Sequence, residues 1–136
     1  MPLGVDASVA VKWMTPEVLT DQARGLLAGP ELLIAPDWVL LEAASAFWRK
    51  VKHSELLMIH AMRHIEVLPG FFSALHSSAA LLPAALSLAF QLRHPVYDCL
   101  YLVLAKREGA RLVTADQQFA ARASAVGEGE LIDLLA

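Results

Sequence analysis

The sequence contains a single cysteine, Cys99, among its 136 residues. An intrachain disulfide is therefore impossible, and a zinc site built from several cysteines is excluded. We expect the thiol to be a small buried side chain with no chemistry of its own, because free cysteines are among the most buried residues. A lone reduced thiol fits a reducing compartment, so the cytoplasm is the expected location.

Long hydrophobic runs and a leader sequence are also missing. The most apolar stretch, residues 79–90, is interrupted by Pro83 and Ser87 and is shorter than the roughly 20 residues that a membrane-spanning helix needs. The first residues, MPLGVDASVAVKW, lack the basic segment and the long apolar segment of a secretion signal. We therefore expect neither a membrane span nor export.

Two signatures of nucleotide-binding and nucleic-acid-binding proteins are absent as well. The sequence has no glycine-rich phosphate loop, so nucleoside-triphosphate chemistry has no support. The formal net charge is −3, which is not the electrostatic signature of general nucleic-acid binding. This balance does not exclude a nucleic-acid substrate, however, because acids gathered around a metal ion would by themselves make the total negative.

What the sequence has in excess is hydrophobic residues, 57% of the chain against roughly 45–50% in an ordinary soluble domain. This surplus fits a heavily buried parallel sheet, an apolar oligomer interface, or both. Short apolar runs alternate with helical patterns, which favours an α/β sandwich with a mainly parallel sheet, and the length fits one domain. The expected strands are residues 3–5, 32–35, 71–75, 111–114 and 131–134, and the expected helices are residues 8–14, 15–27, 36–53, 54–69 and 79–92, one opened by Pro95, and 116–123.

Four acidic residues fall near the carboxyl ends of the expected strands, which is where parallel α/β proteins bind ligands. Asp6 and Asp116 each follow a strand closely. Asp98 lies in the first turn of the helix opened by Pro95, and Glu42 lies in the second turn of the helix after the second strand. Taken singly, each aspartate has an ordinary alternative, as a helix N-cap or as a first-turn carboxylate favoured by the helix dipole.

Glu42 is harder to explain. It is the only charged residue between Trp38 and Trp48, and no cation lies within one helical turn on its own face. Carboxylates are seldom buried without a partner, because the loss of hydration costs several kcal/mol. Its ordinary alternatives are a position at the margin of the apolar face or an ion pair with a distant arginine.

The four acids together are more informative than each alone. Four ionised carboxylates can share a pocket only with a cation, since their repulsion would otherwise protonate some of them. Hard oxygen ligands with no accompanying histidine or cysteine select Mg²⁺ or Mn²⁺ rather than zinc. Such an ion lowers the pKa of a bound water and stabilises the charge that develops in an in-line displacement. Phosphodiester hydrolysis is the natural chemistry for this set.

Four stretches of the sequence together resemble a PIN domain of the VapC toxin type. They are VDASVAVKW, the Glu42 helix after IAPD, HPVYDCLYLVLAKREGA and RLVTADQQFA, and the resemblance extends from residue 3 to about 135. It implies a single PIN-like domain over residues 1–136 with a three-layer α/β/α sandwich. It also implies Mg²⁺- or Mn²⁺-dependent endoribonuclease activity on an RNA substrate, a homodimer, and inhibition by a small VapB-like antitoxin.

The resemblance also assigns roles to the four acids by position. Asp6, Asp98 and Asp116 match direct metal ligands. Glu42 matches the fourth acid of the set, which would complete the metal's surroundings through a water or orient the nucleophile.

Two hydroxyl residues match positions that hold these carboxylates in place, namely Ser8 after the first aspartate and Thr114 before the last. The chain departs from some relatives after the last aspartate, where they carry another acid and this sequence has Gln117 and Gln118. That departure leaves open whether one metal ion or two are bound.

Two other functions stay open at this point. One is a non-catalytic PIN-like module that binds protein or RNA, and the other is a phosphatase in which Asp6 is a covalent nucleophile. Such phosphatases usually carry a second acid two residues further on, where Ser8 stands here.

Other polar and aromatic residues fit structural roles. The basic segment at residues 49–53 can contact an RNA backbone, but we favour cations that complement a helix dipole. Lys12 can reach a phosphate or a site carboxylate, or be solvated. We expect the tryptophans to lie in the core or at a dimer interface rather than to stack on RNA. They are Trp13, Trp38 and Trp48.

Metal binding gives a first prediction. If the four acids converge, saturating Mg²⁺ or Mn²⁺ raises the melting temperature by several degrees, because a ligand bound only by the folded state stabilises that state by mass action. Thermal unfolding followed by circular dichroism, with EDTA as the reference, measures this shift. A melting temperature that does not change at millimolar metal would contradict a shared metal site.

Overall fold

The computed structural model describes residues 1–136 and contains one five-stranded sheet. All four strand pairings are parallel, and the strand order is β3-β2-β1-β4-β5. The central strand β1 pairs through Leu3 with Leu33 on one side and through Val5 with Val113 on the other. The strands are β1 (Leu3–Val5), β2 (Leu33–Pro36), β3 (Ala74–His76), β4 (Arg111–Thr114) and β5 (Ile132–Leu134).

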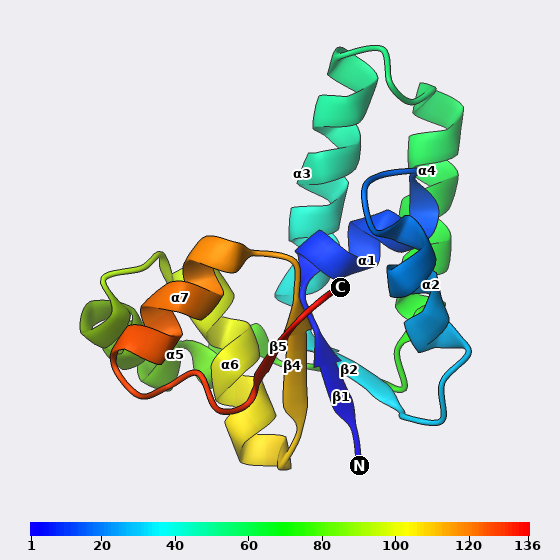
Figure 1. Ribbon diagram of the computed structural model, residues 1–136. Helices are drawn as coiled ribbons and strands as arrows, with labels where there is room; N and C mark the ends of the chain where they lie inside the picture. The colour runs from blue at the N-terminus through cyan, green and yellow to red at the C-terminus, as the bar shows by residue number, and fades with distance from the viewer.

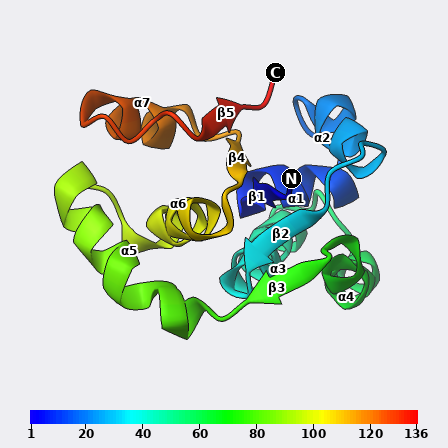
Figure 2. The same cartoon turned by 90° about the horizontal axis from the view of Figure 1, so that it is seen from below.

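Helices cover both faces of this sheet, as the view along the layers shows (Figure 2). The helices α1 to α4 lie on one side, and α5 to α7 lie on the other (Figures 1 and 2). The expected three-layer α/β/α sandwich with a parallel sheet is therefore confirmed. The helices are α1 (Ala7–Met14), α2 (Thr20–Leu27), α3 (Trp38–Lys52), α4 (Met58–Val67), α5 (Ser78–Leu92), α6 (Val96–Glu108) and α7 (Gln117–Ala125), with a short 3-10 helix at Leu68–Phe71.

The helix α6 forms the centre of the core. Every residue from Cys99 to Ala105 is buried, because the helix packs on β1, β2 and β4 and is covered by α5 on its other side. Its backbone ends at Gly109, which adopts a left-handed conformation with φ of 61°. The helix begins next to the carboxyl ends of the strands, so it brings its first turn, with Asp98, to the edge where ligands bind.

Several expected boundaries were wrong where local hydrogen bonds compete with a helix or strand. The second helix begins at Thr20 rather than Thr15, because the Thr20 hydroxyl accepts a hydrogen bond from the Glu17 amide and donates one to the Thr15 carbonyl. The helix expected from Ser54 begins at Met58, since Ser54 has a φ of 60° and terminates the preceding helix.

The third strand also begins at a different residue than expected. The chain forms a 3-10 helix up to Phe71 and pairs with β2 only from Ala74, so β3 begins later than residue 71. Pro83 lies inside α5 and does not delay its start, because Ser77 caps the helix at its N-terminus. Tyr97, in α6, is 49% exposed and stacks on Trp38, with ring centroids 5.3 Å apart.

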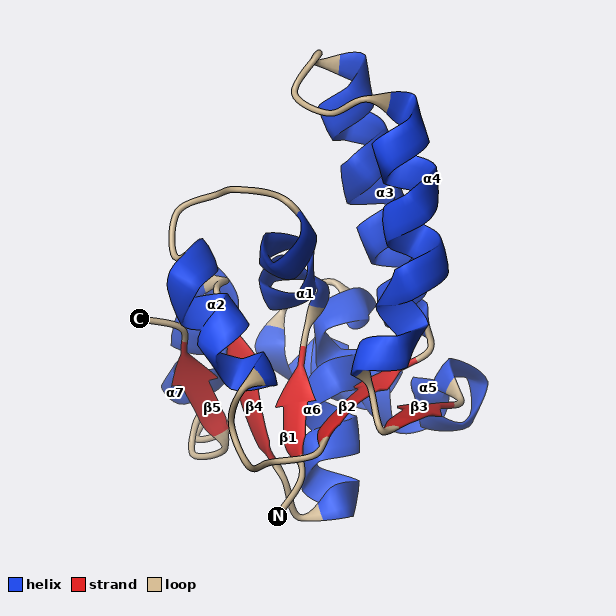
Figure 3. Ribbon diagram, turned by 90° about the vertical axis from the view of Figure 1, so that its right-hand side faces the viewer, coloured by secondary structure: helices blue, strands red, loops and turns tan.

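The helices α3 and α4 form a hairpin that projects beyond the sheet (Figures 1 and 3). Phe47 and His64 pack between the two helices. The far part of the hairpin leaves large apolar side chains exposed, which is unusual for an isolated surface helix. These side chains are Trp48, Leu57, Met58, Ile59 and Met62. No helix of the chain is both long enough and apolar enough to cross a membrane.

Trp13 and Trp48 have opposite environments. Trp13 is 5% exposed, packs against Phe71 and Phe72, and donates its indole N–H to the carbonyl of Ala23 at 2.8 Å. It thereby joins α1 to α2 and fits the expected core position. Trp48 is 62% exposed on the hairpin.

This difference predicts the stability of two matched variants. We expect Trp13→Phe to lower the free energy of unfolding by about 2–3 kcal/mol, because it opens a gap in the core and removes the hydrogen bond from the indole to the Ala23 carbonyl. We expect Trp48→Phe to change it by less than about 0.5 kcal/mol. Urea unfolding of both variants measures the difference, and equal effects would show that the indole of Trp13 is not part of the core.

Candidate active site

The four predicted acids lie around one cleft at the carboxyl edge of the sheet. The chain leaves β1 toward one face and β4 toward the other, which opens a crevice between these neighbouring strands. The cleft there has a volume of about 420 Å³. Its polar lining includes Asp6, Ser8, Lys12, Glu17, Glu42, Arg49, Asp98 and Asp116.

Asp6 is the most buried of the four acids, with 3% exposure. It is the N-cap of α1, and its Oδ1 accepts hydrogen bonds from the Ser8 hydroxyl at 2.6 Å and from the Val9 amide at 3.2 Å. Its Oδ2 accepts a short hydrogen bond from the hydroxyl of Thr114. Three donors thus fix the orientation of this carboxylate.

Ser8 and Thr114 connect the ends of β1 and β4. The Ser8 hydroxyl accepts a hydrogen bond from the Ala115 amide at 3.0 Å, and the Thr114 hydroxyl accepts one from the Asp116 amide at 3.0 Å. Each hydroxyl therefore donates to Asp6 and accepts from the segment that carries Asp116. These contacts keep the first and the last acid in a fixed relation.

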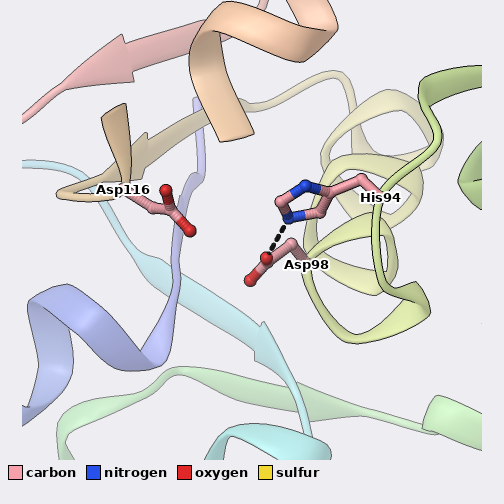
Figure 4. A group of neighbouring side chains, drawn as sticks. All are labelled: His94, Asp98 and Asp116. Atoms are coloured by element: carbon pink, nitrogen blue, oxygen red, sulfur yellow. Dashed lines mark hydrogen bonds and ion pairs between the residues drawn. The ribbon is translucent and has the colours of Figure 1, made fainter. Parts of the chain in front are cut away.

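Asp116 and Asp98 face each other across the cleft (Figure 4). Asp116 caps α7, with Oδ1 accepting from the Phe119 amide at 3.0 Å. Asp98 accepts a hydrogen bond at Oδ2 from His94, with 2.5 Å between the two atoms. The second oxygen of each aspartate has no hydrogen bond within the protein. Ligand atoms of His94, Asp98 and Asp116 all lie within 4.8 Å of one another.

Glu42 has a partner on another helix. The hydroxyl of Tyr101, in α6, donates a hydrogen bond to Glu42 Oε1 at 2.6 Å. A phenol carries no charge to balance the carboxylate, so this contact orients Glu42 without neutralising it. Burial and the neighbouring carboxylate raise the pKa of Tyr101, which therefore stays a donor.

Three of the four acids have raised pKa values. Burial raises the pKa of Asp6 to about 6, although hydrogen bonds from Ser8 and Thr114 oppose the rise. Burial raises the pKa of Glu42 to about 7, against the hydrogen bond from Tyr101, and the charges of Asp98 and Asp6 add to the rise.

The pKa of Asp98 is also raised, chiefly by burial and in part by the charge of Asp116, against a lowering by His94. Burial is the main cause of each rise, and the charges of neighbouring carboxylates add to it, as expected where acids gather in one cleft. No lysine or arginine forms a salt bridge with any of the four acids. A divalent cation is the partner that fits this donor set.

The basic residues near the cleft make no salt bridge with the four predicted acids. Lys12 and Lys50 both pair with Glu17, at 3.3 and 2.6 Å. Arg49 lines the cleft and donates to Ser45 at 3.0 Å. Lys12 therefore contacts Glu17, a carboxylate that also lines the cleft, but none of the four predicted acids.

Two residues of the site were missed in the sequence. Neither Tyr101 nor His94 was among the predicted site residues. The expectation that no histidine accompanies the acids was wrong, because His94 lies four residues before Asp98 and reaches its carboxylate across the start of α6. That spacing is the one signal in the sequence that points to this pair.

The chain is similar to known proteins in both sequence and fold. The family model of the PIN domain matches residues 4–125. Ribonuclease VapC3 of Pyrobaculum aerophilum is 34% identical over 122 residues, which are 88% of this chain and 93% of that protein. The crystal structure of PAE2754 from Pyrobaculum aerophilum superposes with a TM-score of 0.73 over 98% of this chain and 83% of that chain. Its sequence is 24% identical, so this likeness shows the fold alone.

The raised pKa values predict how pH affects stability without metal. Between about pH 4 and pH 7, folded Asp6 and Glu42 keep protons that the same groups have lost in the unfolded chain. The folded state then binds more protons, so the free energy of unfolding falls as pH rises through this window.

Urea unfolding in EDTA at pH 5 and pH 8 tests this dependence. We expect lower stability at pH 8, a weaker pH dependence in Asp6→Asn and Glu42→Gln, and recovery when Mg²⁺ is added at pH 8. Asp133, whose pKa is lowered by Arg111, titrates below this window and does not contribute. A metal-free protein that is more stable at pH 8 than at pH 5 would contradict the assignment.

Proposed function

This chain belongs to the PIN-domain family, as a VapC-type member, and from that premise we propose that it is a divalent-metal-dependent endoribonuclease, the toxin of a toxin–antitoxin pair. The similarity to Ribonuclease VapC3 supports the reaction class. The observation that carries the proposal is the set of four partly or fully buried carboxylates that surround one cleft with no lysine or arginine paired to any of them.

Asp98 and Asp116 are the proposed principal ligands of Mg²⁺ or Mn²⁺, because each has one carboxylate oxygen without a protein partner. Asp6 is the third proposed ligand, and its orientation is fixed by Ser8 and Thr114. A cation held by these residues would stabilise charge on the scissile phosphate and lower the pKa of a bound water molecule. Because the ligand atoms are carboxylate oxygens, magnesium and manganese suit the site better than zinc.

Glu42 is the proposed general base. Burial raises its pKa to about 7 in the metal-free site, and such a carboxylate is basic enough to accept a proton from the attacking water. Tyr101 holds one oxygen of Glu42 and leaves the other for this transfer.

The remaining proposals concern assembly. The expected partners are RNA, a small VapB-like antitoxin, and a second copy of the chain in a homodimer, with a cytoplasmic location and a single domain over residues 1–136. The exposed apolar side chains of the α3–α4 hairpin support a docking area for an antitoxin helix. An arginine from that partner, placed among the acids, would replace the charge of the metal.

The phosphatase alternative has little support. A covalent nucleophile needs an accessible oxygen, whereas Asp6 is almost completely buried and both of its oxygens accept hydrogen bonds. The non-catalytic binding module is tested by the same experiment as the nuclease.

RNA cleavage by the purified protein tests the proposal. In Mg²⁺ or Mn²⁺ we expect cleavage that EDTA abolishes, and we expect Asp98→Asn and Glu42→Gln each to lower kcat/KM by at least about 100-fold. The control is Asp133→Asn, since Asp133 pairs with Arg111 outside the cleft, and it should cleave like the wild type. Equal residual activity in the wild type and both site variants would indicate a contaminating nuclease. Binding of RNA without any cleavage would favour the non-catalytic module.

A further inference from the structure

His94 connects Asp98 to an arginine on another helix. The imidazole lies just after α5, with its Nε2 at 2.5 Å from Asp98 Oδ2. On its other side, Nη1 of Arg122, in α7, lies 3.1 Å from His94 Nδ1 and donates to the carbonyl of Arg93 at 3.0 Å. The chain Arg122–His94–Asp98 therefore joins α7 to the start of α6.

The arginine decides which imidazole nitrogen carries the proton. A guanidinium can only donate hydrogen bonds, so His94 Nδ1 must be the acceptor. Nε2 then carries the hydrogen and donates it to Asp98. With both nitrogens engaged, the imidazole has no lone pair directed at the cleft, although its ligand atom lies within 4.8 Å of those of Asp98 and Asp116.

The surroundings hold this ring in place. His94 is buried and packs against the ring of Phe119, with ring centroids 5.1 Å apart. Phe119 and Arg122 both belong to α7, the helix that Asp116 caps. One short helix thus carries one proposed metal ligand and also the two side chains that position the histidine bound to another.

We propose that His94, fixed by Arg122, is a positioning residue that orients the carboxylate of Asp98, so that Oδ1 of Asp98 faces the cation. This inference rests on the proposed metal-dependent function and deepens it. It assigns His94 to the surroundings of the ligands rather than to the ligands themselves. The coordinating protein atoms are then all oxygens, which keeps the preference of the site for magnesium or manganese.

Binding of Mn²⁺, measured by electron paramagnetic resonance, tests the proposal without using activity. His94→Leu removes the donor, and we expect Mn²⁺ affinity to fall by about 10- to 100-fold. His94→Gln restores an N–H donor near the position of Nε2, and its affinity should recover most of that loss. Arg122→Met releases the ring without altering it and should weaken binding by a smaller factor.

Two matched controls separate positioning from packing. His64→Leu removes a histidine that also packs on a phenylalanine, Phe47, but contacts no carboxylate. Arg107→Met removes an arginine that also donates to a backbone carbonyl, that of Ala80, away from the cleft. Both should bind Mn²⁺ like the wild type. Melting temperatures in EDTA establish that each variant is folded, and Arg122→Met gives a result even where His94→Leu does not fold.

A spectroscopic measurement tests the alternative that a nitrogen of His94 coordinates the metal directly. Electron spin-echo measurements on the Mn²⁺-bound wild type should show no coupling to an imidazole nitrogen ligand. A directly coordinated nitrogen that disappears in His94→Gln would overturn the proposal, as would equal Mn²⁺ affinity in His94→Leu and His64→Leu.

Failure of the inference is distinguishable from failure of the proposed function. With RNA as substrate, the activity of His94→Leu should approach that of the wild type as Mg²⁺ is raised, with KM for RNA unchanged. If the wild type binds Mn²⁺ but cleaves no RNA, the nuclease proposal fails while the affinities still decide the role of His94. If Asp98→Asn binds Mn²⁺ as tightly as the wild type, Asp98 is not a ligand and the inference is wrong.

Discussion

Desolvation of negative charge at one edge of the sheet is the constraint on which the rest of the site depends. Asp6, Glu42 and Asp98 all have raised pKa values, and burial is the largest cause in each. The side chains that donate hydrogen bonds to these three acids are hydroxyls, a phenol and an imidazole, none of which carries the charge of a lysine or arginine. The protein therefore orients the acids but leaves most of their charge for a cation to balance.

The same residues serve the fold and the cleft at once. Asp6 and Asp116 cap α1 and α7, so the ordinary explanation for an aspartate at a helix start is correct for both. A cap uses one carboxylate oxygen, however, and in Asp116 the other has no protein partner. Capping and metal binding are thus compatible, because a carboxylate has more acceptor positions than the helix terminus requires.

The buried helix α6 explains why the site is well fixed. It supplies Asp98 at its first turn and Tyr101 one turn later, and its remaining surface is enclosed by the sheet and by α5. A helix packed on both sides cannot rotate without disturbing the core. The hydrogen bond from Tyr101 fixes Glu42 of α3 relative to this helix. The contact of Arg122 with His94 fixes Asp98 relative to α7.

The sequence by itself determined the fold class and the four acids that meet at the cleft. Parallel strands followed closely by Asp6 and Asp116 have to bring those residues to one edge, because parallel strands end on the same side. Element boundaries were less certain at Thr20, Ser54 and Phe71, where side-chain hydrogen bonds, a left-handed backbone and a 3-10 turn prevail over helix and strand patterns.

Only the tertiary structure decided which side chains form hydrogen bonds with the acids of the site. The pairs Tyr101–Glu42 and Arg122–His94 join residues 59 and 28 positions apart, and no local pattern encodes such contacts. Glu42 has no cation on its own helix, and the sequence could say no more than that. The fold provides a neutral phenol for one of its oxygens and three other carboxylates around the same cleft, because α3 and α6 both begin at the carboxyl edge of the sheet.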